Sequence, residues 1–153
     1  MKLGLEKLLN EPELQRLLKG RRVAYLGHPA SVDRNGRHGL DLLKELGTLS
    51  LTSAFGPQHG MRGEKQDNMI ESEHYRDPDT GVIVFSLYSE VRRPTPEMID
   101  SFDVLLVDMQ DVGCRVYTYL TTLLYMMEAC AKAGTDLSEG TYPARTCTSA
   151  TRM

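Results

Sequence analysis

Four short apolar runs along the chain predict four buried β-strands. They lie at residues 22–27 (RVAYLG), 49–55 (LSLTSAF), 82–87 (VIVFSL) and 103–109 (DVLLVDM). Three of these runs are apolar along nearly their whole length, which is typical of strands that are covered on both faces. Because strands of that kind belong mostly to parallel sheets, the pattern predicts a parallel sheet.

Segments with helical spacing alternate with most of these strands. Leucines recur at that spacing over residues 3–18, and similar signals cover residues 39–46 and 117–133. The dipeptide Thr95-Pro96 is typical of a helix start, with an N-cap followed by the first helical residue. The alternation predicts an α/β domain, an open and mostly parallel sheet with helices on both faces.

The stretch after Gly134 breaks this alternation. Residues 135–153 read TDLSEGTYPARTCTSATRM and contain only one aliphatic residue larger than alanine. A buried core strand cannot be built from that composition. We therefore expect the domain to occupy residues 1–134. We expect residues 135–153 to be a disordered tail, or the product of a truncated or frame-shifted coding sequence.

Composition and charge exclude several classes of function. The chain is 41% hydrophobic and 25% charged with a net charge of −3, so it lacks the basic character of a nucleic-acid-binding domain. No apolar run approaches the roughly 20 residues of a membrane span. Residues 1–20 lack the apolar stretch of a signal peptide, so we expect a cytoplasmic protein. The three cysteines lack metal-ligand spacing and are expected to be reduced.

Sequence motifs narrow the possible chemistry further. No GxGxxG or Walker A pattern is present, so we expect no nucleotide and no other cofactor. The GxSxG motif of α/β-hydrolases is absent as well. These observations exclude some site types and leave the partner and the oligomeric state open.

Polar residues gather after the predicted strands rather than before them. The carboxyl ends of parallel strands meet at one edge of the sheet, where open α/β sheets bind ligands, so these residues are expected to converge. The competing explanation is that loops at this edge are long and polar in any α/β protein. The residues in question are His28 and Ser31 after the first strand; Gln58, His59, Arg62 and Glu64 after the second; Tyr88, Glu90, Arg92 and Arg93 after the third; and Gln110, Asp111, Cys114, Arg115 and Tyr117 after the fourth.

Two of these carboxylates are candidates for catalysis. Glu90 follows a buried strand directly, and Arg92 or Arg93 beside it would lower its pKa, which favours a nucleophile, base or electrostatic role. A surface ion pair is the equally weighted alternative for Glu90. Asp111 lies further into its loop than Asp108, which we expect to cap a backbone turn.

The other polar residues suggest binding rather than proton transfer. His59 in a glycine-rich turn is typical of a hydrogen-bonding residue, while Arg62 and Arg115 are suited to a carboxylate or phosphate. Tyr117 is suited to stacking on a sugar ring. No metal is expected, because the spacing of the available ligands matches no compact motif. Those ligands are His59, Glu64, Asp67, Glu71 and His74.

Four ordered motifs resemble those of one bacterial family. They are SVDRNGR (31–37), FGPQHGMRGE (55–64), VFSLYSEVRRPTPEM (84–98) and VDMQDVGCRVYTYL (107–120). The family that they resemble was long catalogued as a domain of unknown function and is that of the exo-β-N-acetylmuramidases. Its enzymes release N-acetylmuramic acid from the non-reducing end of peptidoglycan fragments.

The resemblance implies a Rossmann-like N-terminal domain, a smaller C-terminal domain, and an active site in the cleft between them. Two departures from the family pattern stand out. Many members have Pro-Glu-His-Gly where this chain has Gln58 before His59, so a carboxylate role there is lost or moves to Glu64. Nothing in residues 135–153 matches the Leu-Asp-Arg-Pro-Asn-Pro-type run of many members.

The resemblance also implies roles for individual residues. Cleavage of a glycosidic bond usually needs two carboxyl groups, and the family's loop glutamate falls on Glu90, with Asp111 or Glu64 as the second. Alternatively, the 2-acetamido group of the substrate attacks the anomeric carbon, and one carboxylate suffices. A non-catalytic carbohydrate-binding module or an inactive truncated fragment is the competing function. The residues expected to bind the muramyl saccharide are His59, Arg62, Arg115 and Tyr117.

Overall fold

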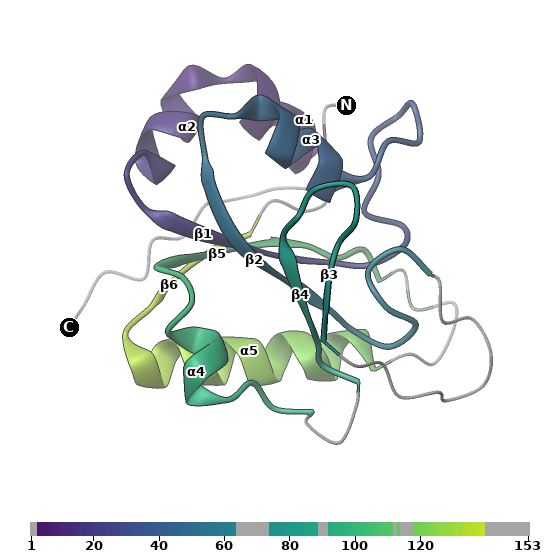
Figure 1. Cartoon of the computed structure of the whole chain (residues 1–153), viewed down its shortest axis with the longest axis vertical. Helices are drawn as coiled ribbons and strands as arrows, with labels where there is room; N and C mark the ends of the chain where they lie inside the picture. Colours follow the sequence, from purple (N-terminus) through teal and green to yellow (C-terminus); the bar gives the residue numbers. More distant parts are fainter. Residues whose placement is uncertain (1–2, 64–73, 89–91, 112, 114–117, 140–153) are drawn as a thin grey trace.

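A central sheet of six strands organises the chain (Figure 1). The computed structural model describes residues 3–63, 74–88, 92–111, 113 and 118–139. The strand order is β3-β4-β2-β1-β5-β6, and every neighbouring pair is parallel except β3 with β4. The strands are β1 (Arg22–Gly27), β2 (Ser50–Gly56), β3 (Tyr75–Arg76), β4 (Ile83–Ser86), β5 (Val104–Asp108) and β6 (Asp136–Glu139).

Helices cover both faces of the sheet, which confirms the α/β fold class (Figure 1). Three helices lie on one face, and two lie on the other. Within the described residues, no helix has both the length and the apolar character needed to cross a bilayer. The first group is α1 (Gly4–Asn10), α2 (Pro12–Leu18) and α3 (Gly39–Leu46), and the second is α4 (Pro96–Ile99) and α5 (Tyr119–Ala133).

Local signals in the sequence account for the helix ends. Thr95 caps α4 as predicted, because its side chain accepts a hydrogen bond from the Met98 amide and Pro96 follows it. Gly47 and Gly134 end α3 and α5 in the left-handed conformation, at φ 65° and 69°. The chain therefore starts and stops these helices with its own capping residues.

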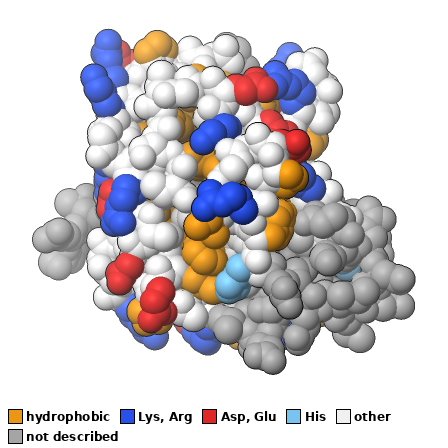
Figure 2. Space-filling model, viewed as in Figure 1, with side chains coloured by type: hydrophobic (Ala, Val, Ile, Leu, Met, Phe, Trp, Pro, Cys, Tyr) orange, Lys and Arg blue, Asp and Glu red, His pale blue; other side chains and the backbone are white. Residues whose placement is uncertain are grey.

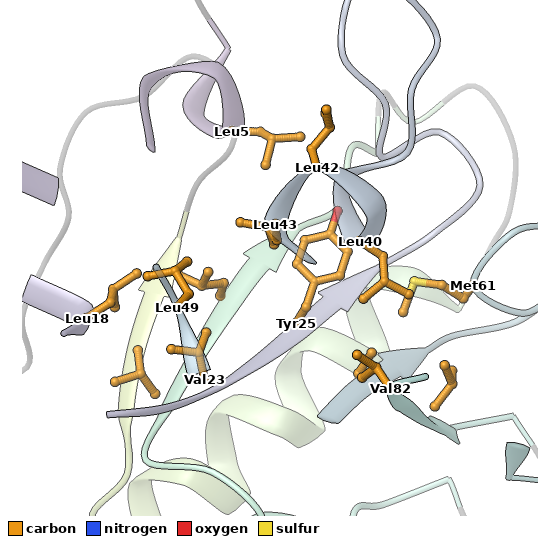
Figure 3. Close-up of a cluster of buried hydrophobic side chains, with 14 residues drawn as sticks. Leu5, Leu18, Val23, Tyr25, Leu40, Leu42, Leu43, Leu49, Met61 and Val82 are labelled. Carbon is orange, nitrogen blue, oxygen red and sulfur yellow. The ribbon is translucent and has the colours of Figure 1, made fainter. Parts of the chain in front are cut away.

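Two apolar clusters, one on each face of the sheet, form the core. Successive side chains of β1 point to opposite faces, so Val23 and Tyr25 join one cluster while Ala24 and Leu26 join the other. Figure 3 shows the first cluster, in which leucines of α3 surround Tyr25. Burial of a valine or leucine side chain in these clusters contributes about 1.5–3 kcal/mol. The central strand is thereby held from both sides.

Two strands lie where none was expected. The expectation that residues 135–153 contain no strand is wrong for β6, whose backbone pairs with β5 from Val104↔Asp136 to Val107↔Glu139. An edge strand needs hydrogen bonds along one side only, so its backbone can join the sheet although its sequence is polar. β3 lies between the predicted strands at 49–55 and 82–87, and it adds an antiparallel edge. Residues 140–153 lie outside the described residues.

Candidate functional site

The parallel register brings the ends of four strands to one edge of the sheet. Gly27 of β1 lies opposite Asp108 of β5, and Gly56 of β2 lies opposite Ser86 of β4. The loops that follow these strands therefore leave from the same edge, as the sequence predicts. Hydrogen bonds join neighbouring loops there; for example, Leu87 N donates to Gly56 O, and Gln110 N donates to His28 Nε2.

A buried polar network links the ends of β1 and β5. Tyr25 Oη donates to Asp108 Oδ2 at 2.9 Å, and both side chains are buried. Burial raises the pKa of Asp108, while the bond from Tyr25 opposes that rise. Ser31 Oγ donates to the Asp108 carbonyl, and His28 contacts both Ser31 and Gln110. Asp108 thus connects β5 to β1 and to the loop after β1, rather than only capping a turn.

Arg62 is held between two carboxylates from different parts of the chain. It donates two hydrogen bonds to Asp41 of α3, at 2.6 and 2.9 Å, and two to Asp77, at 2.9 and 3.2 Å. The Asp77 side chain is fully buried and also accepts hydrogen bonds from the backbone and hydroxyl of Thr80. These contacts tie the loop after β2 to α3 and to the turn that follows β3.

These contacts shift the pKa values of Asp41, Arg62 and Asp77. Hydrogen bonds from Arg62 lower the pKa of Asp41, and hydrogen bonds to Asp41 raise that of Arg62. Burial alone would raise the pKa of Asp77, but the bonds from Arg62 and Thr80 outweigh it and leave the pKa below its ordinary value. All three groups are therefore charged at neutral pH.

The loop after β2 turns back closely over the end of its strand. A side chain at Gly56 would meet the Met61 amide nitrogen at 3.0 Å, a tight contact that favours glycine there. His59 has φ 72°, a left-handed conformation that is uncommon for a non-glycine residue. Gln58 Oε1 accepts hydrogen bonds from Thr118, from the amide at 3.4 Å and from the hydroxyl at 3.2 Å. The loops after β2 and β5 are thereby joined.

Only some of the predicted site residues fall in the described part of the chain. Asp111 is exposed at the sheet edge, and its Oδ1 accepts a hydrogen bond from Gly113 N. His59 and Arg62 lie in the loop after β2, so three predicted residues share this edge. Those that lie outside the described residues are Glu64, Glu90, Arg115 and Tyr117.

The arginines that follow β4 contact aromatic rings. Arg93 forms an ion pair with Glu128 at 2.6 Å, and its guanidinium lies 3.8 Å from the centre of the Tyr125 ring. Arg92 lies 4.8 Å from the centre of the Tyr88 ring. Arg93 therefore holds its loop against α5, at one end of a groove of about 360 Å³ between α4 and α5. The site residues that the structure describes, His59, Arg62 and Asp111, do not line that groove.

The described residues carry no metal-binding cluster. Within residues 3–63, 74–88, 92–111, 113 and 118–139, no group of three or more His, Cys, Asp or Glu side chains is arranged to hold a metal ion. His74 is instead an acceptor, through Nδ1, for the Ser86 amide at 3.1 Å. On the face in Figure 2, basic and acidic side chains are interspersed.

Sequence reasoning missed the partners that hold the site in place. Asp41 and Asp77 were not identified, although they bind Arg62 from positions 21 and 15 residues away. Tyr25 was assigned only to a buried strand, yet its hydroxyl contacts Asp108 across the sheet. No local pattern marks such pairs, because their spacing follows neither the helical nor the strand period.

Comparisons with known proteins give consistent results. The model of the N-terminal part of exo-beta-N-acetylmuramidase NamZ matches residues 23–138. A curated relative, the peptidoglycan beta-N-acetylmuramidase NamZ of Bacillus subtilis (strain 168), is 43% identical over 131 residues, which cover 86% of this chain and 31% of that protein.

Two solved structures of DUF1343 family proteins from Bacteroides fragilis NCTC 9343 share the fold. One is 37% identical with a TM-score of 0.77, and the match covers 93% of this chain and 34% of the other. The second is 32% identical with a TM-score of 0.70, and the match covers 93% of this chain and 35% of the other. The chain therefore spans about a third of the length of these relatives.

Proposed function

This chain belongs to the family of the exo-β-N-acetylmuramidase NamZ, whose N-terminal part it matches. From that premise we propose that it supplies the substrate-binding sheet edge of a glycoside hydrolase. The proposed reaction is release of N-acetylmuramic acid from the non-reducing end of peptidoglycan fragments. The observation that carries the proposal is that the match over residues 23–138 includes all four loops at the carboxyl edge of the sheet. The cytoplasmic location of the protein stays a prediction.

Two carboxyl groups are assigned to the bond cleavage. Glu90 is proposed as the principal catalytic residue, with Asp111 or Glu64 as the second carboxylate. The exposure of Asp111 at the edge where the loops meet supports its access to a sugar. If the 2-acetamido group of the substrate is the nucleophile, Glu90 alone acts as acid and base.

The remaining polar residues are proposed to bind the muramyl saccharide. Muramic acid differs from N-acetylglucosamine by a lactyl group, whose carboxylate is a ligand for arginine. Because four hydrogen bonds from Arg62 already go to Asp41 and Asp77, we assign the lactyl carboxylate to Arg115. Arg62 then positions the loop of His59, and Tyr117 stacks on the sugar.

Hydrolysis of a chromogenic β-N-acetylmuramic acid glycoside tests the proposal. The chain is compared with its Glu90→Gln variant and with Glu13→Gln, which changes an exposed glutamate on α2. Glu90→Gln should lower turnover by at least about 100-fold, the scale of general acid–base catalysis, while Glu13→Gln should leave it unchanged. Turnover that survives Glu90→Gln would contradict the role of that carboxylate.

A second comparison tests the assignment of Arg115. Arg115→Ala should reduce turnover of the muramyl glycoside at least about tenfold more than that of the matching N-acetylglucosamine glycoside, because only the former loses a charged hydrogen bond. Equal losses on the two sugars would remove the specificity role.

A non-catalytic carbohydrate-binding role is the second candidate, and the observation that favours it is the span of about a third of the relatives' length. It predicts that the folded chain binds N-acetylmuramic acid in calorimetry without hydrolysing the glycoside. Absence of both binding and hydrolysis would contradict both candidates.

A further inference from the structure

One buried imidazole contacts both ends of the loop that joins β5 to α5. His28 is 1% exposed and follows β1. Its Nε2 lies 2.8 Å from the carbonyl oxygen and 3.1 Å from the amide nitrogen of Gln110, where the loop begins. Its ring also packs edge-on against Tyr119, at 4.9 Å between ring centres, where the loop ends.

The hydrogen bonds around Ser31 place a proton on Nδ1 of the His28 ring. The Ser31 hydroxyl donates its only proton to the Asp108 carbonyl. Ser31 Oγ therefore accepts from the other two neighbours, His28 N and His28 Nδ1, both at 2.9 Å. Nε2 holds the Gln110 peptide in either form: with a lone pair it accepts the Gln110 N–H at 3.1 Å, and with a proton it donates to the Gln110 carbonyl oxygen at 2.8 Å.

This arrangement couples a residue outside the predicted site to a residue inside it. Gln110 directly precedes Asp111, and the loop between Gln110 and Tyr119 also carries Arg115 and Tyr117. His28 itself is almost fully buried and cannot reach a substrate in this position. Its effect on chemistry must therefore pass through the Gln110 peptide.

We propose that His28 is a positioning residue, which holds the Gln110 peptide through Nε2 and so fixes the place of Asp111 at the sheet edge. This inference rests on the proposed glycosidase function. A displacement of about 1 Å in a reacting group can cost on the order of 100-fold in rate, so one hydrogen bond at the base of the loop is sufficient to matter.

Two substitutions distinguish the contact of Nδ1 with Ser31 from the contact of Nε2 with Gln110. In His28→Gln the side-chain amide reaches the place of Nε2 and can still accept the Gln110 N–H, but the contact with Ser31 is lost. In His28→Asn the shorter amide occupies the place of Nδ1 and keeps Ser31, but loses Gln110. Both variants lose the ring contact with Tyr119, so they form a matched pair.

The measurements are kcat on the chromogenic muramyl glycoside, hydrogen exchange of the Gln110 amide, and the urea midpoint. We expect His28→Asn to lower kcat and to accelerate exchange at Gln110 by at least about tenfold relative to His28→Gln, at similar urea midpoints. Equal kcat and equal exchange in the two variants would overturn the proposal. If the unaltered chain shows no turnover, the glycosidase proposal fails for this chain, and exchange at Gln110 decides the role of His28 alone.

A measurement on the unaltered chain keeps the proposal testable if either variant fails to fold. The ¹⁵N chemical shifts and two-bond couplings of the His28 ring at pH 8 report its tautomer. A proton on Nδ1 and a hydrogen-bonded Nε2 are expected. A ring whose Nε2 shift is that of a free nitrogen, one that neither accepts the Gln110 N–H nor donates to the Gln110 carbonyl, would overturn the proposal.

Discussion

Truncation of Asp77 to alanine should strongly destabilise the fold. Its carboxylate is fully buried and accepts four hydrogen bonds, two from Arg62 and two from Thr80. Asp77→Ala leaves a partly buried guanidinium without one of its two carboxylates, and we expect a loss of about 3–5 kcal/mol in the free energy of unfolding. That is a large fraction of the roughly 5–15 kcal/mol that stabilises a typical domain.

Asp41→Ala is the matched control, because it removes the other carboxylate from the same arginine. The Asp41 side chain is 30% exposed, so water replaces part of what is lost, and we expect a cost of about 1 kcal/mol. The chain has no tryptophan, so urea unfolding is followed by far-ultraviolet circular dichroism. A cost for Asp77→Ala that is no larger than the cost for Asp41→Ala would refute the reasoning.

The pH dependence of the same variants gives an independent test. In the folded chain the pKa values of Asp41 and Asp77 lie below the ordinary value for aspartate. Their contribution to the free energy of unfolding is therefore fully present above the ordinary pKa, and it is lost as the pH falls through the folded pKa. The stability difference between the unaltered chain and Asp77→Ala should therefore narrow in acid. A difference that stays constant down to pH 2 would contradict the assignment.

Three further predictions concern the core. Tyr25→Phe should cost about 1–3 kcal/mol at neutral pH, because the buried Asp108 carboxylate loses its donor, and less in acid, where that carboxyl is protonated; an equal cost at both pH values would contradict this. Gly39→Ala places a methyl group 2.9 Å from Tyr25 Cζ and still nearer its hydroxyl, so it should lower the free energy of unfolding by about 1–3 kcal/mol. The loss should be smaller when Tyr25→Phe removes that hydroxyl, and strictly additive losses in urea unfolding would argue against the contact. Burial raises the pKa of Cys130 to about 11, so in a variant without the other cysteines a thiol reagent at pH 8 should label the chain only after unfolding, and fast native labelling would contradict the burial.

The sheet was predictable wherever a strand is buried on both faces. β1 is found at its predicted bounds because RVAYLG is apolar and the two clusters need it on both sides. β3 has two residues, too few for any periodicity to show. β6 is polar in sequence and joins the sheet through its backbone, so a criterion based on hydrophobicity rejects it.

The site was predictable as a place but not as a set of contacts. Parallel strands alone put the loops of Gln58 and Gln110 at one edge, and the structure joins both to their neighbours there. The partners of Arg62 depend on how α3 and the turn after β3 pack, which no spacing rule encodes. The glycine at position 56 was visible in the sequence, but the close approach of Met61 that favours it was not.

The position of β1 at the centre of the sheet has a consequence for synthesis on the ribosome. One side of β1 pairs with β2, but the other pairs with β5, and the loop contact between His28 and Gln110 spans 82 residues. At roughly 5–20 residues per second, the ribosome needs about 4–16 s to make the intervening chain. For that interval the nascent chain carries an apolar strand with one open edge, which is the template on which β5 later docks and also the surface by which two nascent chains would associate.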